Sequence, residues 1–288
     1  GVHGKCGGGK RAGGIHLNLP NLGGAGVSPI FGMVLVIGIF TGLLVILYSA
    51  YSAGSSKTEE AKLLASVEKA FIQLKEAVER MENGGHFLVD IKMNAGGWAG
   101  GTLAVKPHEP PGGDAYGRLE FASKNLQLGD LTFIFEGGAV IENGKNGMEM
   151  ISPPALITIS EVEEENVIRW IRLDVHHIQV ENYSFQMASN RPKTLRVACT
   201  YDNYLVYPET GRPNRTEVTI DLGSRVATET REVWKSYLES LVTTLPMYYR
   251  VSLDPSSLTL TVKGFRENSD IADIFYYERL TKITIGMG

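Results

Sequence analysis

The hydrophobic and polar positions of this chain fall into three successive patterns. Over Ile30–Tyr48 the side chains are almost all apolar, and Thr41 and the final tyrosine are the polar exceptions. Over Lys57–Met81 apolar residues recur at steps of three and four, with charged residues between them. After His86, short β-rich runs alternate with turn residues. The first two patterns predict helix, and the third predicts strands.

The two helical patterns are in phase, so we expect one helix over residues 30–82. Ser28 and Pro29 suit its start, because serine is a good N-cap and the first helical position needs no N–H. Two glycines after Asn83 suit its end. The apolar part rises roughly 30 Å, which matches the hydrocarbon core of a bilayer. A helix that is apolar on every side must leave water, either in a bilayer or in the shared core of a polymer.

Three glycines, Gly32, Gly38 and Gly42, interrupt the apolar stretch. Glycine weakens a helix in water, but it lets helices approach closely in an apolar medium. Gly38 and Gly42 have the four-residue spacing of a GxxxG contact. The pair therefore permits close packing or a local melting of the helix.

The part after the helix predicts an antiparallel β-rich domain with one packed helix, so the expected fold class is α+β. The packed helix is expected over about 228–243, with Val233, Leu238 and Leu241 on its buried side. The runs that predict strands are 86–93, 102–105, 117–122, 131–135, 139–141, 155–159, 167–173, 178–180, 195–201, 204–207, 217–222, 248–253, 258–262 and one within 273–285.

These patterns divide the chain into three regions. Residues 1–26 form a Gly-rich tail, residues 27–83 form the long helix, and residues 84–288 form the β-rich domain. The helix region itself has an apolar half and an amphipathic half.

Charge separates the regions further. All 32 acidic residues follow Ser56, whereas three of the 28 basic ones, Lys5, Lys10 and Arg11, precede it. The part after Ser56 is therefore mildly acidic, and no basic run in it is interleaved with aromatic residues. Nucleic-acid binding needs clustered Lys and Arg. We therefore expect no nucleic-acid partner and a solvated outer domain.

The sequence contains none of the catalytic motifs G-x-S-x-G, H-E-x-x-H or C-x-x-C. Its one histidine pair, His176 and His177, cannot easily ligate one metal, because adjacent strand residues point to opposite faces. The acidic cluster between Glu161 and Glu165 fits a solvated turn. We therefore expect no enzymatic activity, no cofactor and no metal site.

Within the Gly-rich tail, Ile15, Leu17 and Leu19 alternate with polar residues. Alternation predicts a strand, and a lone strand must add to the edge of a sheet, for which a neighbouring subunit is a candidate. The alternative is a tail whose pattern is accidental. The opening glycine, in place of methionine, favours the removal of a leader.

Two cysteines and two acceptor triplets concern covalent modification. Cys6 and Cys199 permit one disulfide between the tail and the body, and the alternative is a buried Cys199 with a free Cys6. Asn182 and Asn214 each begin an N-glycosylation triplet, which matters if the domain is extracellular.

An apolar helix that continues as an amphipathic helix into a β-domain resembles the type IV pilin family. The stretch Gly26–Gly32, which reads Gly-Val-Ser-Pro-Ile-Phe-Gly, is similar to the helix start of archaeal pilins. Phe135–Val140 and Pro153–Leu156 resemble a family of archaeal pilin-like surface proteins. Such pilins are membrane-anchored precursors, which a dedicated peptidase trims and an assembly machinery extracts and polymerises.

The resemblance implies a structural, non-enzymatic subunit of an archaeal extracellular filament, used for adhesion or surface contact. Its partners would be copies of itself, the membrane before assembly, and the pilus assembly machinery. Residues 30–53 would form the filament core, and residues 54–82 would support the outer domain. The implied polymerisation core consists of Ile30, Phe31, Val34, Leu35, Ile37, Gly38, Ile39, Phe40, Gly42, Leu43, Leu44, Ile46 and Leu47.

Other interpretations stay open. The helix would equally anchor a surface protein that never polymerises, with its basic tail in the cytoplasm under the positive-inside rule. A third interpretation is a ligand-binding or enzymatic β-domain displayed on a stalk, although no residue nominates a site. The 26 residues before the helix are either an uncleaved leader or a long retained tail.

Overall fold

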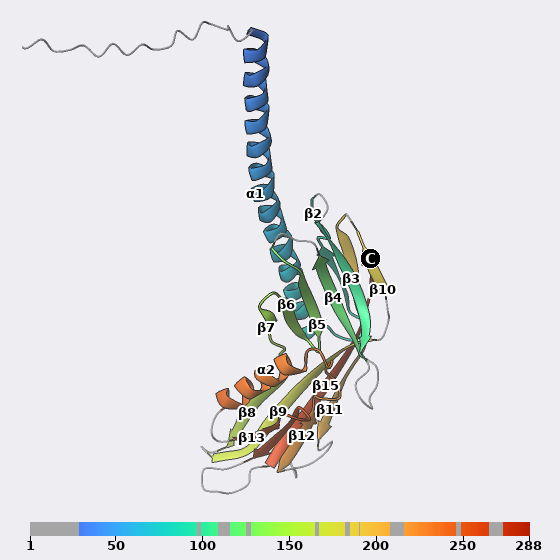
Figure 1. Cartoon of the computed structure of the whole chain (residues 1–288). Coiled ribbons are helices and arrows are strands. Elements are labelled where there is room, and N and C mark those ends of the chain that lie inside the picture. The colour runs from blue at the N-terminus through green and yellow to red at the C-terminus, as the bar shows by residue number, and fades with distance from the viewer. Residues whose placement is uncertain are drawn as a thin grey trace, which may run out of the picture. The chain divides into compact units, whose positions relative to one another are not determined.

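The computed structural model describes residues 29–96, 99–108, 116–124, 128–164, 167–181, 185–189, 191–207, 216–245, 249–264 and 273–288. The chain divides into two compact units, of which the first ends at Ser52 and the second covers Ala53–Gly288. The second unit contains the C-terminal half of a long helix, the strands and a short helix (Figure 1). This division lies inside the long helix.

The long helix, α1, covers Pro29–Glu79. Proline stands at its first residue, where the missing N–H loses no hydrogen bond. The helix ends three residues before the expected end at Glu82. Gly84 then takes a positive φ of 77°, and the N–H of Gly85 donates to the carbonyl of Glu82 at 2.9 Å. The chain thereby turns toward the first strand.

The C-terminal half of α1 forms one wall of the larger hydrophobic core. The ring of Phe71 lies 6.0 Å from the ring of Phe133, measured between centroids. The steps of three and four between buried positions are those of one helical face. The amphipathic pattern therefore marks a core contact of the second unit. The fully buried residues of this face are Leu63, Val67, Phe71, Leu74 and Val78.

Fifteen strands follow in the described part of the chain. They are β1 (His86–Ile91), β2 (Asn94–Gly96), β3 (Ala99–His108), β4 (Tyr116–Lys124), β5 (Leu131–Glu136), β6 (Ala139–Gly144), β7 (Gly147–Ser152), β8 (Ile157–Glu164), β9 (Val167–Val180), β10 (Phe185–Ala188), β11 (Lys193–Tyr207), β12 (Glu217–Asp221), β13 (Tyr249–Asp254), β14 (Thr259–Gly264) and β15 (Asp273–Met287).

Twelve of these strands belong to one sheet, whose main path is β1-β11-β15-β9-β4-β5-β6-β7. From this path, β3 pairs with β4, β2 and β10 pair with β3, and β8 pairs with β9. Strands β12, β14 and β13 form a second, antiparallel sheet. The large sheet is mostly antiparallel, as expected, but β9 and β15 run parallel along Asp273–Ile283. The segments between them supply the long crossover that a parallel pair requires.

A second core lies between the two sheets and the short helix α2 (Arg231–Thr244). Helix α2 lies beside β7 and β13 (Figure 1). Its buried residues are Trp234 and Leu238. The sequence pattern placed Leu238 on the buried side, whereas Val233 and Leu241 are partly buried. Trp234 is also buried, at 2% exposed.

Two strands are longer than the sequence predicted. The pattern broke β9 before Ile178 and β11 before Tyr204, because polar residues occupy these places. In the structure His176, His177 and Asp202 contact side chains of the neighbouring strand β15, and both ladders continue. Strands β2, β7 and β10 were not predicted from the sequence. Strands β2 and β10 have only three and four residues, too few for a clear alternation.

Candidate functional site

The N-terminal half of α1 exposes apolar side chains on all of its faces. Every large apolar side chain from Phe31 to Tyr51 is more than half exposed, from 52% at Leu43 to 76% at Tyr51. With roughly 100 Å² for each side chain, the exposed apolar area is on the order of 1,500 Å², against about 300–600 Å² for the largest patch on an ordinary monomer. At about 25 cal/mol per Å², its contact with water is unfavourable by tens of kcal/mol.

This exposed surface includes apolar residues that the expected polymerisation core left out. All the core residues from Phe31 to Leu47 lie in α1, as does Ile30. The large apolar residues that also face solvent are Met33, Val36, Val45, Tyr48 and Tyr51. We call the surface from Phe31 to Tyr51 the apolar rod. Among the described helices, α1 alone is long and apolar enough to cross a membrane.

Polar side chains in this half of α1 bond to the helix itself. The hydroxyl of Thr41 donates to the carbonyl of Ile37 at 2.8 Å. Ser49 donates to the carbonyl of Ile46 at 2.8 Å. An unpaired hydroxyl is costly in an apolar medium, whereas a hydroxyl bonded to the preceding turn is already satisfied. The hydroxyls of Thr41 and Ser49 therefore need no outside partner when the apolar rod is buried.

The glycines of the apolar rod have no packing role within this chain. A Cβ atom added at Gly32, Gly38 or Gly42 would meet no atom within 4 Å. Each glycine nevertheless weakens the helix by roughly 1 kcal/mol relative to alanine. A close approach by another helix explains such positions, because glycine lets two backbones come near each other.

The C-terminal end of α1 is fixed to the sheet by Arg279 of β15. Its Nη2 donates to the carbonyl of Met81 at 2.6 Å, and its Nη1 donates to the carbonyl of Glu79 at 3.3 Å. Its Nε and Nη2 also pair with the two carboxylate oxygens of Asp202 on β11, both at 2.9 Å. A cation at this position donates hydrogen bonds to carbonyls that have no partner within the helix, and it interacts favourably with the negative end of the helix dipole.

Burial opposes ionisation of Asp202, but the hydrogen bonds from Arg279 and Thr281 outweigh it and hold the pKa of Asp202 below its usual value. The hydroxyl of Thr281 donates to Oδ1 of Asp202 at 2.9 Å. Its oxygen therefore accepts from Nε2 of His176, which lies 2.9 Å away. Burial lowers the pKa of His176 to about 4, so the ring is neutral at pH 7. This chain of bonds is a structural anchor that joins the end of α1 to β15, β11 and β9.

Adjacent residues of a strand point to opposite faces, and His177 accordingly contacts a different residue from His176. Its Nε2 is 3.3 Å from Oε1 of Glu278. Burial lowers the pKa of His177 to about 3, so the ring is neutral at pH 7 and this contact is not an ion pair. The two histidines have separate partners, Thr281 and Glu278.

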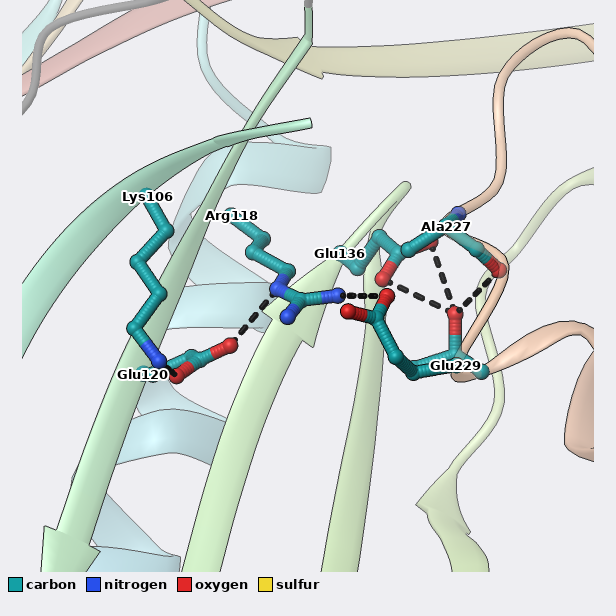
Figure 2. Close-up of polar contacts among 7 residues, drawn as sticks. Lys106, Arg118, Glu120, Glu136, Ala227 and Glu229 are labelled. Atoms are coloured by element: carbon teal, nitrogen blue, oxygen red, sulfur yellow. Dashed lines mark hydrogen bonds and ion pairs between the residues drawn. The ribbon is translucent and has the colours of Figure 1, made fainter. Parts of the chain in front are cut away.

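A second polar cluster lies near the start of α2 (Figure 2). Glu120 of β4 is buried and pairs with Lys106 of β3 and with Nε of Arg118, the latter at 2.6 Å. Nη1 of Arg118 also donates to Oε2 of Glu229 at 2.9 Å. Acids and bases alternate along this cluster, so their charges compensate one another. The cluster ties β3 and β4 to the turn that precedes α2.

Glu136 of β5 is the most buried acid of this region. It accepts hydrogen bonds from the N–H of Ala227 at 2.7 Å and from the hydroxyl of Thr230 at 3.0 Å (Figure 2). Burial raises the pKa of Glu136 despite these bonds. The adjoining cavity, which Trp234 also lines, has about 30 Å³. That volume suits one or two water molecules and excludes a substrate, so Glu136 organises the start of α2.

Replacing Glu136 by glutamine should make folding stability less dependent on pH. Because its pKa is raised, Glu136 contributes its full stability below the usual value of 4.5 and loses it as the pH rises through the folded-state pKa. Glutamine retains an oxygen for Ala227 and has no charge to bury. The melting temperature of E136Q relative to wild type should therefore rise as the pH is raised above 4.5, as measured by thermal unfolding.

The matched variant E136A removes both acceptors. The buried N–H of Ala227 then loses its acceptor, and the hydroxyl of Thr230 keeps only its 3.3 Å bond to the carbonyl of Ala227. The variant should lose roughly 2–4 kcal/mol near pH 4.5, where Glu136 contributes its full stability. A difference between E136Q and wild type that stays constant as the pH is raised above 4.5 would contradict the role of the buried charge.

Several predicted site residues lie outside the described residues. These are Ile15, Leu17 and Leu19 of the expected strand, the acceptors Asn182 and Asn214, and Cys6. Cys199 is described, is 4% exposed and has a free thiol. Its Sγ donates to the carbonyl of Tyr201 at 3.4 Å, and burial raises its pKa. The disulfide between Cys6 and Cys199 stays a prediction, because Cys6 lies outside the described residues.

Comparison with protein families gives one finding. Residues 26–245 match a protein family described as a family of unknown function (DUF7289). The match begins before α1 and ends after α2, so it includes the apolar rod and most of the β-rich part. Neither the comparison with curated proteins nor that with solved structures gave a match.

Proposed function

We propose that this chain, which belongs to the DUF7289 family, is the structural subunit of an archaeal extracellular filament similar to type IV pili. In this proposal residues 30–53 of many copies bundle into the filament core. The β-rich part, with α2 as its one packed helix, forms the outer surface used for adhesion or surface contact. Before assembly the subunit is held in the membrane, from which an assembly machinery extracts it. Asn182 and Asn214 would then be exposed to extracellular glycosylation.

The observation that carries this proposal is the apolar rod together with its glycines. A helix that is apolar on all faces needs apolar neighbours on all faces, which both lipids and sister helices provide. Lipid chains adapt to any helix surface and do not require glycine. Gly38 and Gly42 have no contact within the chain, so they favour sister helices as the final surroundings.

Extraction from the membrane is compatible with the same chemistry. When the apolar rod exchanges lipid neighbours for sister helices, it remains out of water on every side. The hydroxyls of Thr41 and Ser49 keep their bonds within the helix during this exchange. The free energy of hydrophobic burial therefore changes little between membrane and filament.

The second candidate is a surface protein that one transmembrane helix anchors and that never polymerises. The length of the apolar stretch, roughly 30 Å, favours it equally, because that length matches a bilayer. This candidate predicts monomers that remain with detergent or lipid. It gives no role to the glycine pair.

Negative-stain electron microscopy of the full-length protein, released from cells by shearing, separates the two candidates. The proposal predicts filaments that sediment at high speed and contain this chain as the main component. Monodisperse particles that require detergent and show no filaments at any concentration would refute the proposal and support the anchor.

A further inference from the structure

The large sheet is interrupted by a groove between β10 and the end of β15. The groove has about 560 Å³. Its lining comes from β10 on one side and from β15 and β11 on the other, and includes Phe185, Met187, Arg196, Ile285 and Met287. We call it the sheet gap.

The β15 side of the sheet gap presents an unpaired strand edge. Strand β15 pairs with β9 as far as Ile283, whose carbonyl accepts from the N–H of Glu181 at 2.8 Å. Beyond Ile283 its described partner is β11 alone. The N–H of Gly288 donates toward β11, to Thr194 at 3.1 Å. Backbone groups alternate in direction along a strand, so those of Ile285 and Met287 point away from β11 and into the gap.

The β10 side presents a second such edge. Strand β10 pairs with β3, from Phe185 opposite Val105 to Ala188 opposite Thr102. No other described strand pairs with β10. Two four-residue edges, 185–188 and 284–287, therefore line the same groove. One extended segment between them could hydrogen-bond to both.

The inner wall of the sheet gap is apolar. Phe185 and Met187 are partly buried and pack against the core that α1 and the large sheet share. Ile285, on the facing strand, is 3% exposed and belongs to the same core. Thr284 and Gly286 alternate with it along β15. A segment that fits must therefore carry apolar residues on its inner face and polar residues on its outer face.

We propose that the sheet gap receives the segment Ile15–Leu19 of a second copy of this chain as an added strand. The inference rests on the proposed function, because a filament brings many copies together. The segment has the required alternation, with Ile15, Leu17 and Leu19 on one face and His16 and Asn18 on the other. Its five residues are enough to span either four-residue edge. Pro20 would end the pairing because it lacks an N–H.

Strand addition supplies what each component lacks. A lone strand has no partner for its backbone groups, and among the described residues neither β10 nor the end of β15 has a second paired strand. Pairing satisfies both sets and covers the apolar wall of the gap. Each subunit in a filament would thereby be joined to a neighbour by backbone hydrogen bonds as well as by the apolar rod.

Cysteine cross-linking in the full-length protein tests this inference. In a background with Cys6→Ser and Cys199→Ala, Met187→Cys is combined with Ile15→Cys, Leu17→Cys or Leu19→Cys, and the filaments are oxidised. Side chains directly opposite on paired strands are close enough for a disulfide. At least one of the three pairs should give covalent dimers and longer chains on a non-reducing gel. The matched control, His16→Cys with Met187→Cys, should not, because His16 lies on the other face.

The outcomes separate this inference from the proposed function. Filaments that form without any cross-link overturn strand addition and leave the filament proposal standing. A cross-link within a single chain overturns the second copy as the occupant. Absence of filaments in the cysteine-free parent refutes the filament, and strand addition between its subunits with it.

A backbone substitution gives an independent readout. Met287→Pro removes the N–H that faces the gap and leaves the β11 ladder intact, while Met287→Ala keeps it. The proline variant should lower the cross-link yield of the positive pair severalfold relative to the alanine variant. Equal yields in the two variants would contradict hydrogen bonding along this edge.

Discussion

A variant with Gly38→Leu and Gly42→Leu should fail to form filaments while it remains folded and bound to membranes. A Cβ atom at either position meets no atom of the chain, so folding has no reason to change. The two leucines make the helix more apolar and favour the bilayer. They also separate neighbouring helices at the closest point of a GxxxG contact. The sedimentable filament fraction should fall at least about tenfold, which corresponds to roughly 1.4 kcal/mol per contact.

The matched control also introduces two leucines, but it replaces two valines of the apolar rod and leaves Gly38 and Gly42 in place. Val34→Leu and Val45→Leu lie in the same exposed stretch of α1 and should leave both assembly and membrane binding near wild type. Filament yield is measured by sedimentation and negative-stain microscopy, and membrane binding by flotation. If the double leucine variant assembles as well as wild type, the glycines are not a packing surface and the membrane anchor becomes the better proposal.

Phe71→Ala should strongly destabilise the second unit, although residue 71 lies in the helix that precedes the β-rich part. Phe71 is fully buried and its ring lies 6.0 Å from that of Phe133. Removing such a ring from a core costs about 3–5 kcal/mol. For a unit of this size, that loss corresponds to a fall of about 10 °C in melting temperature. Thermal unfolding followed by circular dichroism measures it.

Gln73→Ala is the control, because Gln73 is exposed on the same helix and its loss leaves no cavity. It should shift the melting temperature by no more than about 2 °C. Similar melting temperatures for F71A and Q73A would show that the C-terminal half of α1 contributes little to the core. In that case the helix would be a separable stalk.

The helix could be predicted from the sequence because its signal is local. A long uncharged stretch and a regular spacing of apolar residues each point to helix without reference to any distant residue. Even its end was displaced by only three residues, from Glu82 to Glu79. The residue that binds the last carbonyls is Arg279, 200 positions away in the chain, and no local pattern reports such a contact.

The strands were predicted less well for the same reason. The histidine pair and the Asp202–Asn203 pair looked like breaks, because polar residues in a buried strand are costly when unpaired. The neighbouring strand β15 supplies Thr281, Arg279 and Glu278 as partners. Only the pairing of distant strands brings these groups together, so β9 and β11 continue where the sequence suggested a turn.

By itself, the sequence determined that this chain has a helix with an uncharged, apolar half and an amphipathic half, followed by a strand-rich region. Periodicity and composition act over a few residues, and one chain displays them fully. The tertiary structure alone decided that the amphipathic half belongs to the core, that β9 and β15 run parallel, and that a gap separates β10 from β15. These features depend on contacts between residues far apart in the chain. Such contacts form only when the strands, the helix and their buried side chains pack together.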